Sequence, residues 1–168
     1  MAEVSLEAVK TLREQTSAGV MDCKNALEEA GGDMVKAAEL LRQKGVILAG
    51  KKSSRETPEG VVDCYIHTGN RVGAIVEGNC ETDFVARTPE FKELVHNLAM
   101  QVAAMAPRYV DNGSIPAEDT ANPEEACLME QPFIKDPSQT ITNLVNEVVA
   151  RLGENIRVRR FERFALGE

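Results

Sequence analysis

The sequence has few aromatic residues and no excess of positive charge. Its 168 residues include no tryptophan, five phenylalanines and two tyrosines, and the formal net charge is −8. Because phosphate binding requires a basic surface, this charge excludes a general nucleic-acid-binding protein, although it does not exclude a local basic patch. No apolar run approaches the ~20 residues of a membrane span, and no apolar segment typical of a signal peptide follows the first residues. We therefore expect a cytoplasmic globular protein with no membrane association and no direct nucleic-acid partner.

Residues with catalytic or metal-binding chemistry are few and scattered. The four cysteines form no C-x-x-C pair, and the chain has two histidines. This spacing does not favour a zinc site, and it is typical of reduced, mostly buried thiols in a cytoplasmic protein. His67 and His96 have no neighbouring serine or cysteine in a recognisable catalytic pattern, so we expect both on the surface. We expect no catalytic residue, no metal and no cofactor, and a small hydrolase using His67 or Cys80 is the weakest functional alternative.

Gly45–Lys51 matches the spacing of a phosphate-binding loop, G-x-x-x-x-G-K, but not its chemistry. That loop continues with Ser or Thr, which holds Mg²⁺, whereas the next residue here is Lys52. The segment also follows an expected helix rather than a strand. We interpret Gly45 as the end of that helix.

Apolar periodicity divides the chain into three parts. Residues 1–49 carry three sets of helically spaced apolar residues and predict a three-helix module, in which Asp33 caps the third helix and Val35 faces inward. Residues 50–59 are polar and are typical of a linker. Residues 60–168 mix strand and helix patterns, so we expect an α+β class with an antiparallel sheet packed against helices.

The third part has a recognisable order of elements. A period of two on both sides of Gly69-Asn70 predicts an antiparallel hairpin, and Thr88-Pro89 begins a helix with a continuous apolar stripe. Residues 107–137 hold five of the seven prolines and are expected to be irregular, with at most a short helix. A helix is expected again over 140–152. The tail then alternates as a strand whose inward positions step from Val158 to Phe161, which indicates either a bulge or an edge that changes partners.

Between the hairpin and the striped helix lies Cys80–Arg87, which contains Asp83-Phe84. In one interpretation Phe84 packs inward and Asp83 caps a turn. In the other, Phe84 is a rigidly mounted, protruding aromatic beside a carboxylate, which is typical of a binding hot spot. The residues alone leave both open.

The turn between the first two helices offers a second candidate. Val20 and Met21 directly follow a glycine, where core residues are not obviously needed. They either close the small helical core or form an exposed, adaptable contact for a partner.

Three blocks of the sequence resemble the elongation factor Ts family, the guanine-nucleotide exchange factors of the GTPase elongation factor Tu. They are Val9–Arg13 with Thr16–Leu27, then Asn79–Arg87, and finally Gly153–Ile156 with Arg159–Phe161. Ser17 and Val20 stand where the family often has Gly and Met. The resemblance implies a ubiquitin-associated-like fold for residues 1–49 and a mixed α+β core after the linker.

The resemblance also implies a partner and a set of contact residues. In the family, the Thr-Asp-Phe-Val segment, here Thr82, Asp83, Phe84 and Val85, enters the GTPase domain of elongation factor Tu near the nucleotide's magnesium site. The N-terminal module contacts the same domain through positions that match Arg13, Val20, Met21 and Lys24. The implied function is exchange: binding to elongation factor Tu·GDP, promotion of GDP release by disturbing the magnesium and phosphate site, and displacement when GTP binds.

The length of the chain adds an expectation about assembly. Longer family members carry a duplicated core subdomain, which 168 residues cannot accommodate. The chain is similar to the short form of the family, so we expect a homodimer that buries sheet edges and apolar core surface, and a complex of two copies with two partners. The competing interpretation is an adaptor whose ubiquitin-associated-like module binds an unrelated partner, but it leaves Asp83-Phe84 unexplained.

Overall fold

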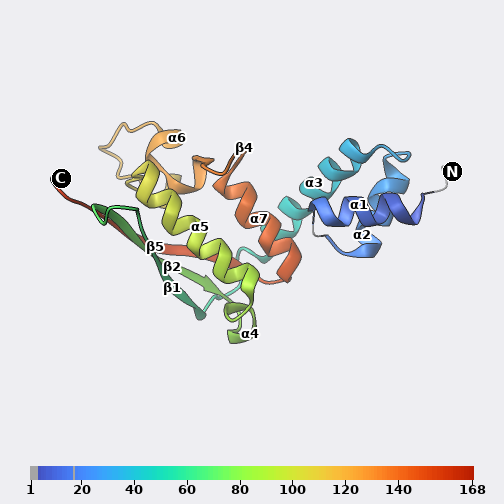
Figure 1. Cartoon of the computed structure of the whole chain (residues 1–168), viewed down its shortest axis with the longest axis horizontal. Coiled ribbons are helices and arrows are strands. Elements are labelled where there is room, and N and C mark those ends of the chain that lie inside the picture. Colours follow the sequence, from blue (N-terminus) through green and yellow to red (C-terminus); the bar gives the residue numbers. More distant parts are fainter. Residues whose placement is uncertain (1–3, 17) are drawn as a thin grey trace.

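The computed structural model describes residues 4–16 and 18–168, which form two lobes (Figure 1). The N-terminal lobe consists of α1 (Leu6–Thr16), α2 (Val20–Glu29) and the first part of α3 (Met34–Lys52). The core lobe has a sheet of β1 (Glu59–Ile66), β2 (Val72–Cys80) and β5 (Ile156–Ala165), with helices on one face. Its other elements are α4 (Asp83–Ala86), α5 (Pro89–Met105), η1 (Asn112–Ser114), α6 (Pro123–Ala126), η2 (Leu128–Glu130), β3 (Pro132–Phe133), β4 (Asp136–Thr140) and α7 (Ile141–Leu152).

This order of elements confirms the predicted α+β class and the three N-terminal helices. The ubiquitin-associated-like character of the N-terminal helices stays a prediction. Ser17, one of the two departures from the family pattern, lies outside the described residues.

The N-terminal lobe has a small core of its own, which consists of Val9, Leu12, Cys23, Ala26, Leu27 and Ala37. Asp33 caps α3, because its Oδ1 accepts the backbone N–H of Val35 at 3.0 Å and that of Lys36 at 3.1 Å. The expectation that Val35 faces inward is wrong. It is 80% exposed, and Ala37 takes the inward position in this turn.

The third helix is longer than the sequence predicts. Gly45 does not end it, because α3 continues to Lys52. Gly45 is buried where α3 crosses α7, and a Cβ at Gly45 would lie 3.5 Å from the Cβ of Ala150. The glycine therefore permits a close approach of two helices rather than ending one, and α3 joins the two lobes as a continuous helix (Figure 1).

The hairpin and the striped helix form as predicted. The N–H of His67 donates to the carbonyl of Val72 at 2.8 Å, and Gly69 and Asn70 form the turn with positive φ angles of 92° and 55°. Thr88 caps α5 by accepting the N–H of Phe91 on its Oγ1 at 3.2 Å. Both elements are built by local sequence signals, which explains why the sequence predicts them.

β2 lies between β1 and β5 and pairs with both in antiparallel fashion. Along the β2–β5 ladder the pairing passes from Glu77–Arg160 to Gly78–Val158, so Arg159 is an extra residue. The bulge predicted in the tail is therefore confirmed.

α5 packs across one face of the sheet. Gly78 permits this packing, since a Cβ at Gly78 would lie 2.5 Å from Cγ2 of Val95. The opposite face of the sheet is open to solvent at five uncharged positions: Val62, Cys64, Ile66, Ile75 and Phe164.

Residues 107–137 contain short turns, two single-turn 3₁₀ segments and the four-residue helix α6, as the prolines predict. α7 then begins after Thr140, whose Oγ1 accepts the N–H of Asn143 at 3.2 Å, and ends at Gly153 with a φ of 76°. Within residues 4–16 and 18–168, no helix combines the length and the apolar character needed to cross a membrane.

Candidate partner-binding site

Phe84 lies on α4, a single helical turn that projects from the core lobe (Figure 1). The residue is 80% exposed. Its neighbours Val85 and Ala86 are buried instead, and they anchor the turn in the core. The interpretation in which Phe84 packs inward is therefore wrong. Of the four core-lobe residues that the resemblance singles out, Phe84 is presented to solvent and Val85 is part of the support.

Hydroxyl caps hold this turn at both ends. Thr82 Oγ1 accepts the N–H of Val85 at 3.4 Å, which satisfies one donor at the start of α4. Thr88 Oγ1 donates to the carbonyl of Val85 at 2.8 Å and also caps the next helix. A short turn fixed by caps and by buried neighbours keeps an exposed side chain in one position, which lowers the entropy that binding must remove.

Asp83 accompanies Phe84 and is paired within the turn. Its Oδ2 lies 2.9 Å from Nη2 of Arg87, one helical turn later. Both side chains are well exposed, so the pair contributes little to stability. It nevertheless gives the carboxylate a defined position beside the aromatic ring.

The support of α4 extends to a segment to which the sequence assigned no role. Glu154 Oε2 accepts the N–H of Glu81 at 3.1 Å and that of Thr82 at 3.0 Å. In return, Glu81 Oε1 accepts the N–H of Asn155 at 2.6 Å, and this bond holds the pKa of Glu81 below its ordinary value. Gly153-Glu154-Asn155 was visible as part of the family resemblance, but only the folded chain brings it to the base of α4.

The second group of predicted contact residues lies on the N-terminal lobe. Val20 and Met21 begin α2 and are 51% and 62% exposed, while Cys23 and Leu27 of the same helix fill the core. The interpretation in which Val20 or Met21 closes the core is therefore wrong. The other two predicted contact residues of this lobe are both cationic and both exposed: Arg13 and Lys24.

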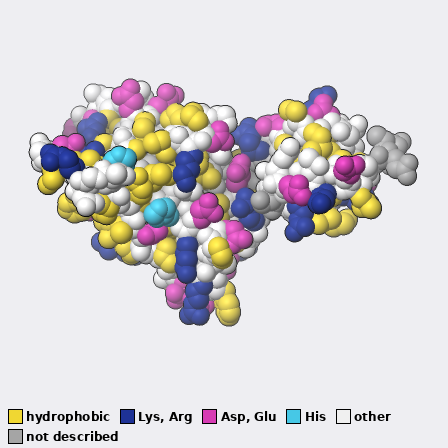
Figure 2. Space-filling model, in the orientation of Figure 1, with side chains coloured by type: hydrophobic (Ala, Val, Ile, Leu, Met, Phe, Trp, Pro, Cys, Tyr) yellow, Lys and Arg dark blue, Asp and Glu magenta, His cyan; other side chains and the backbone are white. Residues whose placement is uncertain are grey.

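The structure thus brings the predicted residues together as two groups, one on each lobe. Figure 2 shows the lobes as separate bodies joined by a narrower neck, with the α4 region projecting from the lower outline of the larger one. A partner must contact both lobes to engage both groups.

The geometry gives no support to a hydrolase. Burial raises the pKa of the Cys80 thiol to about 11, so the thiol stays protonated and weakly nucleophilic at neutral pH. Cys80 pairs with Glu59 at one end of the hairpin, whereas His67 follows Ile66 at the other end. His96 is hydrogen-bonded elsewhere, with its Nδ1 at 3.1 Å from Oδ2 of Asp63.

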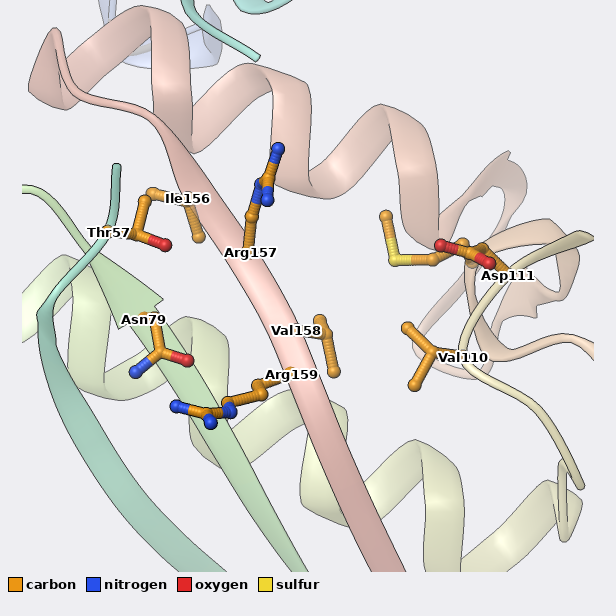
Figure 3. Close-up of a pocket in the computed structure, with 9 residues that line it drawn as sticks. Thr57, Asn79, Val110, Asp111, Ile156, Arg157, Val158 and Arg159 are labelled. Carbon is orange, nitrogen blue, oxygen red and sulfur yellow. The ribbon is translucent and has the colours of Figure 1, made fainter. Parts of the chain in front are cut away.

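A metal site and a reactive pocket are equally unsupported. Among the described residues, no group of three or more His, Cys, Asp or Glu side chains is placed to hold a metal ion. An open pocket of about 640 Å³ lies beside β5 (Figure 3). Its lining is Thr57, Asn79, Val110, Asp111, Met129, Ile156, Arg157, Val158 and Arg159. This lining contains neither a cysteine nor a histidine, so it offers no nucleophile–base pair of the kind considered above.

Comparisons with known proteins identify relatives that span nearly the whole chain. The family model described as "Elongation factor TS" matches residues 7–125 and 120–168. Elongation factor Ts of Rippkaea orientalis is 49% identical over 199 aligned positions, which cover 100% of this chain and 80% of that protein. Elongation factor Ts of Thermotoga petrophila is 47% identical over 194 positions, covering 99% and 98% of the two chains. Elongation factor Ts of Carboxydothermus hydrogenoformans is 48% identical over 195 positions, covering 98% and 90%.

Proposed function

The chain belongs to the elongation factor Ts family and is a translation elongation factor, and we propose that it is the guanine-nucleotide exchange factor of elongation factor Tu. It binds the GDP-bound partner, promotes release of GDP and leaves when GTP binds. It makes and breaks no covalent bond, so it is not an enzyme and needs no cofactor of its own. It acts in the cytoplasm, as the sequence leads us to expect.

The observation that carries this proposal is the exposed Phe84 beside Asp83 on a capped turn that is anchored by buried neighbours. Phe84 enters between side chains of the partner's GTPase domain, near the magnesium ion of the bound nucleotide. The Asp83 carboxylate approaches the same region and disfavours the bound phosphate and its metal ion by charge. An adaptor that used only the N-terminal helices would leave this exposed aromatic without a role.

The energetic basis of exchange is linkage between two ligands of one partner. If this chain binds nucleotide-free elongation factor Tu more tightly than the GDP complex, it must weaken GDP binding by the same factor. The reciprocal weakening by GTP releases the chain at the end of the cycle. Both steps require only non-covalent contacts.

The N-terminal lobe supplies the second contact with the same GTPase domain. Val20 and Met21 present apolar surface, and Arg13 and Lys24 are exposed cations of the same lobe. In this proposal residues 1–49 are a docking module and residues 60–168 are the exchange and dimerisation core. The two contacts act on one partner molecule, so each raises the effective concentration of the other.

The open face of the sheet supports a homodimer. It exposes Val62, Cys64 and Ile66 along β1, with Ile75 of β2 opposite Cys64. Phe164 of β5 lies level with Ile66, because both pair with Gly73, and Glu77 and Glu162 lie on the same face. Contiguous apolar surface of this kind is typical of an interface. We propose that two copies pair through this face, and that the dimer binds two molecules of elongation factor Tu.

Stopped-flow release of a fluorescent GDP from elongation factor Tu tests the proposal. The protein is expected to accelerate release, and Phe84→Ala is expected to lose most of that acceleration, since truncating a hot-spot residue costs ~2 kcal/mol or more. Val35→Ala is the matched control, because Val35 is equally exposed on another part of the molecule. If the wild-type protein left the release rate unchanged, exchange would be rejected. An unaltered rate with Phe84→Ala would reject the mechanism.

A further inference from the structure

The carboxylate of Glu154 is bonded to the start of α4 through both of its oxygens. Oε2 accepts the backbone N–H groups of Glu81 and Thr82, and Oε1 accepts the hydroxyl of Thr82 at 2.6 Å. The same hydroxyl oxygen of Thr82 caps α4 by accepting the N–H of Val85. Glu154 therefore orients the residue from which the Phe84 turn begins.

A second set of hydrogen bonds joins Asn155 to Glu81 and to the linker. Glu81 accepts the N–H of Asn155, and the Asn155 side-chain amide donates to the carbonyl of Arg55 at 2.8 Å. The guanidinium of Arg55 lies 3.4 Å from the carboxylate of Glu81. Segments more than 70 residues apart in the sequence thus meet at one junction of four residues: Arg55, Glu81, Glu154 and Asn155.

This junction lies between the two contact surfaces. Arg55 lies three residues after the end of α3, the helix that joins the two lobes, while Glu81 and Thr82 precede α4. Its backbone donors and carboxylate acceptors satisfy one another, and the side chain of Glu81 is only 22% exposed. Partly desolvated carboxylates are costly unless every bond is made, so the geometry of the junction is fixed rather than adaptable.

We infer that Glu154 is a positioning residue for exchange. It holds Phe84 in a fixed position relative to the linker, and hence relative to the contact surface of the N-terminal lobe. The inference rests on the proposed function, because it assigns to Glu154 an effect on exchange that acts through Phe84. In this role Glu154 acts through the α4 turn and needs no contact of its own with the partner or the nucleotide. A small displacement of Phe84 is sufficient to lose much of its effect on the partner's nucleotide site.

A double-mutant cycle between Glu154→Gln and Phe84→Ala tests the inference. Glutamine keeps the size of the side chain but replaces one accepting oxygen with a donor. One amide oxygen can still accept the two N–H groups, but the hydroxyl proton of Thr82 loses its acceptor. In the Phe84 background we expect roughly tenfold or more loss of the maximal GDP-release rate. In the Phe84→Ala background we expect no further loss, because the residue that Glu154 positions is gone.

Three further measurements keep the test decisive. Glu118→Gln is the control, since Glu118 is an exposed carboxylate in the proline-rich segment and its substitution is expected to leave release unchanged. Hydrogen exchange is expected to show faster exchange of the Thr82 amide in Glu154→Gln. Glu154→Asp keeps the charge with a shorter reach, is expected to retain more of the release rate, and replaces the glutamine variant if that does not fold.

The outcomes separate the inference from the function on which it rests. Equal losses from Glu154→Gln in both backgrounds, or no loss in the Phe84 background, would overturn the positioning role while leaving exchange intact. If Phe84→Ala had no effect by itself, the proposed exchange mechanism would fail first.

Discussion

Arg87 Nη2 lies 2.9 Å from Asp83 Oδ2, so the carboxylate that accompanies the exposed Phe84 is held by a partner one helical turn away. Asp83 can therefore contribute to exchange in two ways. Its charge acts on the partner, whereas its ion pair acts on the shape of α4. Substitutions at the two residues distinguish these contributions.

Asp83→Asn is expected to lower the acceleration of GDP release severalfold, because it removes the negative charge that approaches the phosphate site. Its effect on folding stability is expected to stay below ~1 kcal/mol, since an exposed ion pair contributes little. Stopped-flow release and urea denaturation measure the two effects. Arg87→Gln breaks the same ion pair but keeps the carboxylate, so it is expected to retain most of the acceleration. Equal losses in both variants would show that the ion pair, rather than the charge, is what matters.

The double variant Val20→Ala with Met21→Ala is expected to weaken binding to nucleotide-free elongation factor Tu by about tenfold, as loss of an apolar hot spot would. Its thermal stability should change little, because both residues are largely exposed and the lobe core is made by others. Titration calorimetry with the purified partner measures the affinity. Val35→Ala, an exposed residue of the same lobe, serves as the control. Retention of full affinity in the double variant would remove the N-terminal lobe from the interface.

The proposed dimer predicts a concentration-dependent reactivity of Cys64, the exposed cysteine on the open face of the sheet. Alkylation should slow as protein concentration rises, and light scattering should give twice the monomer mass at micromolar concentration. Phe164→Glu places a charge on the apolar face and is expected to yield monomers with rapidly alkylated Cys64. Leu6→Glu, at an exposed position on the other lobe, should leave the dimer intact. A monomeric wild-type protein under these conditions would contradict the prediction.

Gly78→Ala tests the close packing of α5 on the sheet. The new methyl group would lie 2.5 Å from Cγ2 of Val95, so we expect a loss of about 1–3 kcal/mol in unfolding free energy from overpacking. Gly50→Ala is the matched change in α3, where a Cβ meets no heavy atom within 4 Å. It is expected to be neutral or stabilising, since alanine favours a helix over glycine. Urea denaturation of both variants gives the comparison, and similar losses in the two would show that Val95 relaxes.

The depressed pKa of Glu81 predicts a pH dependence of stability. Because the pKa is lower in the folded chain than its ordinary value of 4.5, the carboxylate stabilises the fold above that pH, and the contribution is lost as the pH falls through the folded pKa. Glu81→Gln is expected to lower the melting temperature at pH 7, and the gap to the wild type is expected to narrow as the pH falls through the folded pKa of Glu81. Thermal melting from pH 7 into the acid range measures the difference. A gap that is the same in acid as at pH 7 would mean that charge plays no part.

Local signals in the sequence determined most elements of the fold. The helix caps at Asp33, Thr88 and Thr140, the turn at Gly69-Asn70 and the apolar stripe of α5 each depend on residues close together in the chain, so they could be predicted from it. The exposed Asp83-Phe84 segment was identified as one of two interpretations, and the family resemblance assigned its role. Two expectations from local sequence patterns are wrong. Val35 faces solvent rather than the core, and the third helix does not end at Gly45.

Only the tertiary structure decided the remaining questions, because they depend on contacts between distant segments. Gly45 continues its helix because α7 packs against it, and the outward direction of Phe84 follows from the burial of Val85 and Ala86 in the core. The bonds from Glu154 to Thr82 span 72 residues of sequence, so no local pattern could indicate them. The sequence determined which residues are candidates for contact with a partner. The folded chain determined how those residues are held.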